Sequence, residues 1–241
     1  MRCLTVILMT SIGPSMPDAS ATNLPHPTRR NIVWLAIQYF FRLVFLVWLR
    51  FQARGLERIA KSGGGLVLVN HQSFLDPMLV GVPLQRPVSY LARDTLFPVP
   101  LIGWILRKTY VMPINRDAAS TASIRESLKR MEQGFLVGVF PEGTRCEAGE
   151  VGEFKPGFVT LIRRGNVPVY PVGIAGAHEA MPRKGLRLRP RTVRIVFGEP
   201  LPRETLLKLC EKGQEEALVQ FARDAVVACQ QEAEDWRQAT L

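Results

Sequence analysis

Residues 66–77 read Leu-Val-Leu-Val-Asn-His-Gln-Ser-Phe-Leu-Asp-Pro, an apolar run that leads into a polar turn. The apolar run predicts a buried strand, and Pro77 suits the first turn of a helix. Residues five apart on one helix do not share a face, so His71 and Asp76 meet only if the chain turns between strand and helix. Two helix starts fit: Asp76 as the N-cap, or Ser73 and Asp76 as a capping box. In both, Asp76 orients the His71 ring and leaves one ring nitrogen free as a base.

The same spacing also fits a histidine that only ends a strand and an aspartate that only caps a helix, because so short a pattern recurs by chance. A second segment favours the catalytic interpretation. Residues 135–139 are again apolar, and Phe-Pro-Glu-Gly-Thr-Arg follows at 140–145. The chain contains no Gly-x-Ser-x-Gly nucleophile motif. A base without a protein nucleophile is suited to activating a hydroxyl group of the substrate itself.

Four blocks of sequence resemble the motifs of a known family. They are residues 70–77, 113–116, 140–145 and 167–172, of which the first and third are specific in combination. The blocks resemble those of the 1-acylglycerol-3-phosphate (lysophosphatidate) acyltransferases, in the glycerolipid acyltransferase superfamily, over about residues 50–200. The resemblance implies transfer of a fatty acyl chain from acyl-CoA or acyl-carrier protein to the free hydroxyl of lysophosphatidic acid. The product would be phosphatidic acid, and no metal or cofactor is expected.

The resemblance also implies a role for individual residues. His71 would be the general base and Asp76 its charge partner. The third block would bind the glycerol phosphate end of the acceptor, with Arg116 and Lys155 as further cations. The residues expected in that block are Glu142, Gly143, Thr144 and Arg145.

Two positions depart from the family pattern. Arg93 stands where relatives often have a phosphate-binding lysine, which keeps the charge but changes a point cation into a planar fork. Tyr110 stands near the place where the second block usually opens with glycine. Arg93, Arg116 and Arg145 each follow an apolar run, where the strands of an α/β sheet end and ligands collect. We therefore expect Arg93 to bind the acceptor phosphate as well.

The order of apolar runs and helical patterns predicts the fold. The two alternate after Gly55, which is typical of one α/β domain over residues 55–241 with a mixed or largely parallel sheet flanked by helices. Strands are expected at 66–70, 88–92, 110–114, 135–140, 167–174 and 192–197. Helices are expected at 75–82, 96–107, 118–133 and 156–164, with an amphipathic helix or helix pair over 203–237.

The region before this domain has two parts. Residues 1–30 are expected to be a disordered leader, and residues 31–54 a membrane-anchoring helix. The apolar run is long enough to span a bilayer, but an arginine near its middle, Arg42, costs about 2.5–3.5 kcal/mol on insertion scales. We expect this helix to lie in the membrane interface, with a full span as the alternative. An ordinary core helix fits less well, because little of its circumference is polar.

The charge balance favours an anionic partner. The chain has 31 basic and 21 acidic residues, a formal net charge of +10, and residues 181–194 hold six basic residues and no acidic one. No zinc-finger spacing or RNA-binding aromatic motif accompanies them, so we expect no nucleic acid. We expect the anion to be the phospholipid head groups of a membrane surface or an acyl-CoA phosphate. A solvated basic face remains an alternative. The four cysteines form no C-x-x-C pair, which favours reduced thiols and a location at the cytoplasmic face of the inner (plasma) membrane.

Two other functions remain open from the sequence. Arg93 and Tyr110 also fit an acyltransferase for another lysolipid, including an amino-acid-derived lipid without a phosphate. A non-catalytic lipid-binding membrane protein would use the apolar helix and the basic loop alone, and His71 would then be structural. Turnover that depends on His71 separates the last hypothesis from the others.

Overall fold

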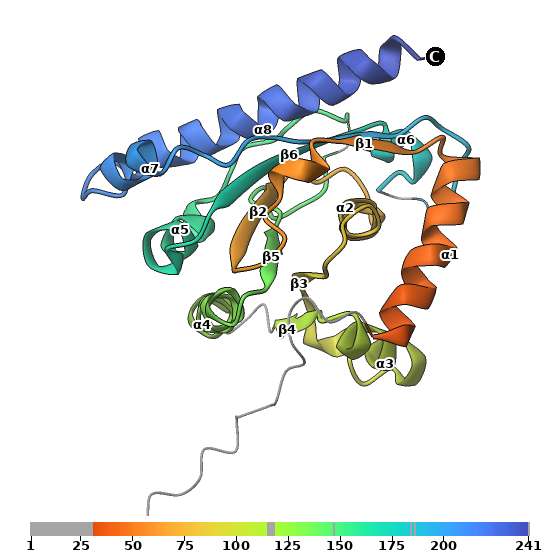
Figure 1. Ribbon diagram of the computed structural model, residues 1–241, viewed down its shortest axis with the longest axis horizontal. Helices are drawn as coiled ribbons and strands as arrows, with labels where there is room; N and C mark the ends of the chain where they lie inside the picture. The colour runs from red at the N-terminus through yellow and green to blue at the C-terminus, as the bar shows by residue number, and fades with distance from the viewer. Residues whose placement is uncertain (1–30, 115–118, 147, 184, 186, 241) are drawn as a thin grey trace, which may run out of the picture.

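The structure is a computed structural model that describes residues 31–114, 119–146, 148–183, 185 and 187–240. The expected leader, residues 1–30, lies outside the described residues. The described strands form one seven-stranded sheet in the order β1-β7-β6-β2-β5-β3-β4 (Figure 1). Their bounds are β1 Gln52–Arg54, β2 Gly65–Val69, β3 Val88–Arg93, β4 Met112–Ile114, β5 Leu136–Val139, β6 Val169–Ala175 and β7 Arg194–Phe197.

The direction of the strands confirms the predicted fold class. β2 pairs in parallel with both β5 and β6, and β3 pairs in parallel with β5 and β4. β7 runs antiparallel to β6 and parallel to the edge strand β1. The sheet is therefore mixed but largely parallel. β2 is buried along its whole length, as its continuous apolar sequence predicts for a central parallel strand.

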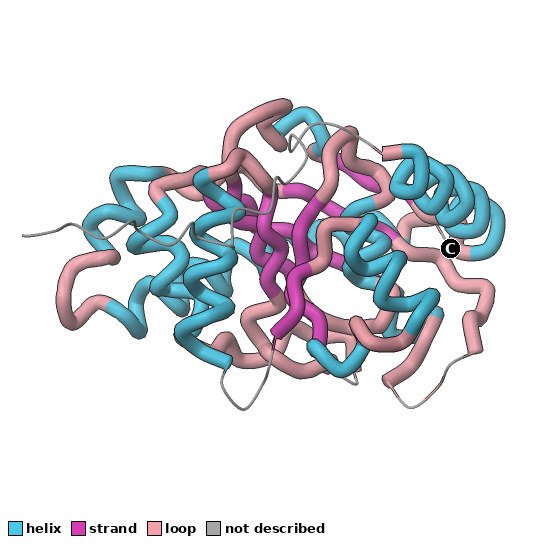
Figure 2. The backbone as a smooth tube through the Cα atoms, turned by 90° about the horizontal axis from the view of Figure 1, so that it is seen from below, coloured by secondary structure: helices cyan, strands magenta, loops and turns pink. Residues whose placement is uncertain are grey.

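Helices cover both faces of the sheet (Figures 1 and 2). On one face Leu66 and Leu68 of β2 contact α4, α5 and α8, while Val67 and Val69 point to the other face and the core shared with α1 and α2. This alternation follows the two-residue period of a strand. The helices are α1 Ile32–Trp48, α2 Asp76–Gly81, α3 Pro100–Lys108, α4 Ala119–Glu132, α5 Val159–Gly165, α6 Ala177–Ala180, α7 Arg203–Leu209 and α8 Glu215–Gln238, with 3₁₀ turns at η1 Leu56–Arg58, η2 Asp94–Leu96 and η3 Pro156–Phe158.

The first helix differs from the expected anchoring segment over 31–54. α1 ends at Trp48, and residues 52–54 form β1, which pairs with β7. One side of α1 packs on the domain, because Phe45 is fully buried and Gln38 Nε2 donates to the carbonyls of Val82 (2.8 Å) and Leu84 (2.7 Å). Among the residues that the structure describes, no helix has both the length and the apolar character needed to cross a bilayer.

The basic segment 181–194 is only partly a surface. Arg191 is paired with Glu179 at 3.3 Å, and Arg194 is buried. Arg194 donates to the hydroxyl of Thr240 near the end of the chain and to the carbonyl of Arg50. The expectation that this whole stretch faces an anionic surface is therefore wrong for Arg194, whose guanidinium fastens β7 to its neighbours.

Candidate active site

A tight turn between β2 and α2 brings His71 and Asp76 together, as the sequence predicts. His71 Nδ1 lies 2.8 Å from Asp76 Oδ2. The same oxygen accepts hydrogen bonds from the backbone N–H groups of Gln72 (2.6 Å) and Ser73 (2.7 Å). Asp76 is fully buried, whereas 20% of the His71 side chain is exposed. Three hydrogen-bond partners thus hold one oxygen of the carboxylate, and part of the imidazole is exposed to solvent.

The electrostatics of Asp76 balance two effects. Burial raises the pKa of Asp76 above 3.8, and the hydrogen bond from His71 and the two backbone N–H groups act against this rise. With Nδ1 assigned as the donor to the carboxylate, Nε2 is the acceptor nitrogen of the neutral ring. Of the two residues in the pair, only His71 has an exposed side chain.

The start of α2 differs from both predicted geometries and keeps one hydrogen bond of the capping box. The helix begins at Asp76 with Leu75 as its N-cap, so Asp76 is not itself the N-cap. The Asp76 carboxylate returns to the Ser73 N–H, which is the bond expected of a capping box. The Ser73 hydroxyl is buried and donates to the carbonyl of Met181 at 2.9 Å. Ser73 is therefore placed as a structural residue and not as an exposed nucleophile.

The second polar segment lies against the first, because β5 and β2 are parallel neighbours and end at the same edge of the sheet. Glu142 Oε1 accepts a hydrogen bond from the His71 N–H at 2.8 Å. The N–H of Cys146 in turn donates to the His71 carbonyl at 2.8 Å. The loop that contains residues 142–146 is therefore fastened to the backbone of His71 on both sides.

Glu142 is the least exposed residue of the expected acceptor-binding set 142–145. Its side chain is buried, burial raises its pKa, and its carboxylate also accepts the N–H of Gly152. Both backbone donors lie inside the protein. The Glu142 carboxylate therefore stabilises the turn through backbone hydrogen bonds. Gly143 and Thr144 are the exposed residues of the same turn.

Cationic side chains surround the exposed part of this turn. The Arg145 guanidinium lies 3.6 Å from the centre of the Phe74 ring and donates to the carbonyl of Arg183 at 3.3 Å. Partial burial lowers the pKa of Arg145, and the charge of Arg183 adds to this shift. Gly143 has a φ of +70°, and a Cβ there would lie 3.3 Å from Lys155 Nζ. The structure thus brings Lys155 and Arg145 to the turn that begins beside His71.

A comparison with known proteins identifies the family. The family model described as acyltransferase matches residues 50–175, which include both polar segments. This chain belongs to the acyltransferase family. A chloroplastic 1-acyl-sn-glycerol-3-phosphate acyltransferase of Brassica napus is 31% identical over 166 residues, 67% of this chain and 48% of that protein. The chain thus spans about half the length of that relative.

Two bacterial relatives are closer to this acyltransferase in length. A 1-acyl-sn-glycerol-3-phosphate acyltransferase of Bacillus subtilis is 28% identical over 166 residues, 68% of this chain and 80% of that protein. The crystal structure of the 1-acyl-sn-glycerophosphate (LPA) acyltransferase PlsC of Thermotoga maritima superposes with a TM-score of 0.69 at 26% identity. The match covers 84% of this chain and 78% of that one.

Of the two remaining expected phosphate ligands of the acyltransferase site, Arg93 lies further along the sheet. Arg93 is exposed at the C-terminal end of β3, the strand that borders β5 on the side away from β2. It therefore lies at the same edge of the sheet as His71, with β5 between their two strands. Arg116 lies outside the described residues.

Four further residues support the position of His71, and the sequence does not predict a role for any of them. The Phe140 ring stacks on the His71 ring at 4.2 Å, and Tyr90 stacks on Phe140 at 5.5 Å. Gly138 makes room for this column, because a Cβ there would lie 2.1 Å from the Tyr90 ring. Asn70 joins β2 to β6 through two hydrogen bonds with the backbone of Ile174. These contacts depend on strand register, for which the sequence contains no local signal.

Tyr110, the second departure from the family pattern, lies in the interior of the protein. It is buried in a small cluster with Trp34 and Phe135. Its φ is +65°, a left-handed conformation that glycine adopts without strain. A glycine at this position would relieve that backbone strain.

The described part of the chain was compared with two other kinds of site, a metal site and a reactive thiol. No group of His, Cys, Asp and Glu there has the arrangement of a metal site. Cys146, Cys210 and Cys229 are free thiols. Burial raises the pKa of Cys229 to about 11, so this thiol is inert at neutral pH.

Proposed function

We propose that this acyltransferase moves a fatty acyl chain from an acyl thioester, acyl-CoA or acyl-carrier protein, to the free hydroxyl of lysophosphatidic acid. The product is phosphatidic acid, an intermediate of phospholipid synthesis. The observation that supports this most is the His71–Asp76 pair, 2.8 Å apart, with the cationic turn fastened to the His71 backbone. The names of the Brassica napus and Bacillus subtilis relatives support the choice of acceptor.

The chemistry follows from the two faces of the imidazole. Asp76 holds Nδ1–H, so Nε2 accepts the proton of the acceptor hydroxyl as its oxygen attacks the thioester carbonyl. The carbon–sulfur bond of the tetrahedral intermediate then breaks. The leaving thiolate takes the proton from the imidazolium, which restores the neutral ring. A positioned general base contributes about 10²–10⁴-fold to such a rate.

The acceptor phosphate fits the cations of the turn. Arg145 offers a planar fork and Lys155 a point charge, and both suit a phosphate group. Phe74 supports the Arg145 guanidinium from below, which limits its motion. Gly143 and Thr144 add exposed backbone to the same place. In this arrangement the phosphate end is bound beside the base that activates the hydroxyl.

A pair of variants tests the base. His71→Ala should reduce transfer by at least about 10²-fold, because no other group replaces Nε2. Cys146→Ser, which changes a thiol in the same loop, should retain transfer. Activity is measured with labelled acyl-CoA and acyl-carrier protein and a panel of lysolipids, with and without a phosphate. Near-normal turnover by His71→Ala, or preference for an acceptor without a phosphate, would refute the proposal.

We also propose that α1 and α3 hold this enzyme in the membrane interface, at the cytoplasmic face of the inner membrane. The two helices contact each other, and Asn31 Nδ2 donates to the carbonyl of Lys108 at 2.8 Å. Large apolar side chains of both are exposed, and so large a patch is typical of an interaction surface. They are Ile32, Tyr39, Phe40, Leu43, Leu46, Val47 and Trp48 on α1, and Leu101, Ile102 and Trp104 on α3.

A matched set of leucine variants tests membrane binding. Leu43→Glu and Leu101→Glu place a charge on the proposed membrane face, and Leu207→Glu on α7 changes an equally exposed leucine elsewhere. Flotation with lipid vesicles should recover less protein for the first two and not for the third. An equal loss for all three would contradict the proposed face. Protease accessibility in spheroplasts tests which side of the membrane holds the enzyme.

A further inference from the structure

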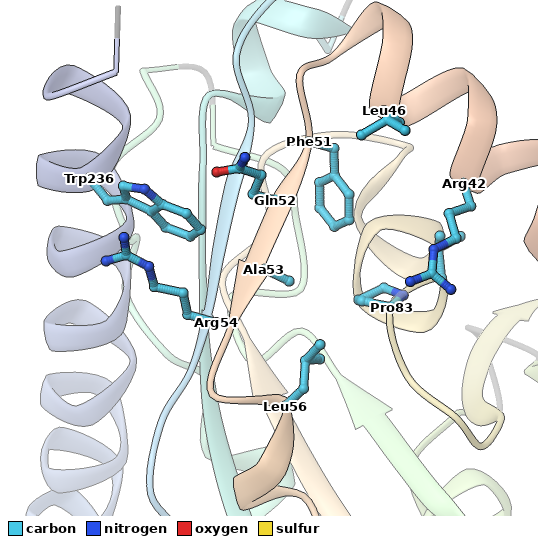
Figure 3. Close-up of a pocket in the computed structure, with 10 residues that line it drawn as sticks. Arg42, Leu46, Phe51, Gln52, Ala53, Arg54, Leu56, Pro83 and Trp236 are labelled. Atoms are coloured by element: carbon cyan, nitrogen blue, oxygen red, sulfur yellow. The ribbon is translucent and has the colours of Figure 1, made fainter.

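A pocket of about 440 Å³ lies at the outer edge of the sheet, where β1 has no second strand neighbour in the described sheet. Residues of α1, β1, the chain after α2 and the end of α8 line it (Figure 3). None of these belongs to the two segments that form the catalytic site. The proposed acyl transfer therefore leaves this pocket without a role.

Two arginines flank the pocket, one on each side of β1. Arg54 lies beside Trp236 of α8, with its guanidinium carbon 3.7 Å from the ring centre, and Arg42 extends from α1 toward Pro83 (Figure 3). None of the ten described residues that line the pocket is acidic. Within the part of the chain that the structure describes, neither Arg42 nor Arg54 has an ion pair. The pocket thus has an uncompensated positive charge.

A third, buried arginine adds positive charge beside the pocket. Arg194, which neighbours β1 in the sheet, lies 4.9 Å from the centre of the same Trp236 ring. Its pKa is lowered by burial first and then by the charge of Arg54. Two guanidinium groups therefore share one aromatic ring, and an anion placed in the pocket reduces their repulsion.

Apart from Gln52, the remaining wall of the pocket is apolar, and it is continuous with the proposed membrane face. Leu46 lines the pocket and is also an exposed residue of α1. Phe51 and Leu56 extend the apolar wall from α1 toward the sheet edge. A ligand with an anionic head group and an apolar tail can contact both the arginines and the apolar wall. A fully polar anion would contact the arginines only and leave the apolar wall exposed.

We propose that this pocket binds one anionic phospholipid of the bilayer. The phosphate lies at the edge of β1 between Arg42 and Arg54, and an acyl chain passes over Leu46 onto the exposed side of α1. Arginine suits the phosphate because its fork donates two hydrogen bonds. A zwitterionic lipid is disfavoured, because its ammonium group meets these arginines and no carboxylate in the pocket wall.

Binding of soluble short-chain lipids to the purified full-length protein tests the site. Dioctanoyl phosphatidylglycerol and dioctanoyl phosphatidylcholine are titrated by calorimetry in a nonionic detergent. We expect one site with about tenfold tighter binding of the anionic lipid. Dioctanoyl phosphatidic acid, which has the head group of the proposed product, is the third ligand. Equal affinity for all three lipids overturns the proposal.

Four variants separate this pocket from the catalytic site and from the general charge of the protein. Arg42→Gln with Arg54→Gln should weaken binding of the anionic lipid about tenfold or more. Ala53→Phe, which places a ring in the pocket, should weaken it without a change of charge. Arg145→Gln should leave it unchanged, since that residue belongs to the active site.

The charge-matched control is Arg125→Gln with Arg164→Gln, on exposed positions of α4 and α5. An equal loss in this control shows diffuse attraction and refutes the pocket. Unchanged binding in the Arg42/Arg54 variant, or in Ala53→Phe with normal thermal unfolding, refutes it too. Loss of binding in Arg145→Gln alone assigns the lipid to the active site.

Discussion

The substitution Glu142→Gln separates two roles for the acid of the third block. The resemblance to acyltransferase motifs makes Glu142 a ligand of the acceptor, whereas the structure gives its carboxylate two backbone donors inside the protein. These donors are the N–H groups of His71, at 2.8 Å, and of Gly152. Glutamine keeps the shape of the side chain and changes only one oxygen into an amino group.

The size of the effect follows from these two hydrogen bonds. A hydrogen bond to a charged group contributes about 1.5–3 kcal/mol. In glutamine the acceptor is neutral, and an NH₂ group replaces one of the two acceptor oxygens. Burial of a neutral amide costs less than burial of a carboxylate, which offsets part of the loss. We expect the free energy of unfolding to fall by about 1–2 kcal/mol.

The same substitution should reduce kcat more than it changes the acceptor KM. A turn that shifts relative to His71 misplaces the hydroxyl, and displacements of this kind cost about 10- to 100-fold in rate. Urea unfolding and steady-state kinetics at varied lysophosphatidate measure both effects, with the exposed Glu153→Gln as the control. A normal unfolding curve with a tenfold higher acceptor KM would mean that Glu142 contacts the acceptor directly.

Three other predictions concern the scaffold. Gly173→Ala should lower the free energy of unfolding by about 1–3 kcal/mol, because its Cβ would lie 2.1 Å from the backbone nitrogen of Gln230 in α8. The control Gly157→Ala should not lower it in this way, because no atom lies within 4 Å of the added Cβ. Burial lowers the pKa of His178 below 6.5, so the unfolded chain binds its proton first as the pH falls. Urea titrations should show stability lost below about pH 6.5, and His178→Gln should reduce that loss. Cys229 should react with a thiol reagent only as the protein unfolds, which mass spectrometry follows.

Most of the central sheet is predictable from local sequence. Strands β2, β5 and β6 are continuous apolar runs, so their type and approximate bounds follow from composition alone. β1 is not predictable in this way, because it has only three residues and its side chains alternate between exposed and half-buried. Its pairing with β7 depends on a contact more than a hundred residues away, which no local pattern encodes.

The candidate site divides in the same way. His71 and Asp76 are five residues apart, so turn geometry alone predicts their contact. The burial of Glu142 and the aromatic column behind His71 need the register of β2, β5 and β3, and the sequence does not contain that register locally. The motif resemblance treats the residues of the third block alike, and it does not distinguish the buried Glu142 from the exposed Gly143 and Thr144.

The two parts of the candidate site should respond differently to substitutions that weaken the sheet. The base and its orienting carboxylate form one local unit, held by backbone N–H groups of the same turn. The cations Arg145 and Lys155 lie on the third block and the segment after it. The sheet, the hydrogen bonds of Glu142 and Cys146 with the His71 backbone, and the contact of Arg145 with Phe74 connect them to His71. Loss of sheet register should therefore separate phosphate recognition from proton transfer while the His71–Asp76 bond persists. Binding energy from the phosphate then no longer orients the hydroxyl at Nε2, so a weakened sheet lowers the rate although the catalytic pair remains intact.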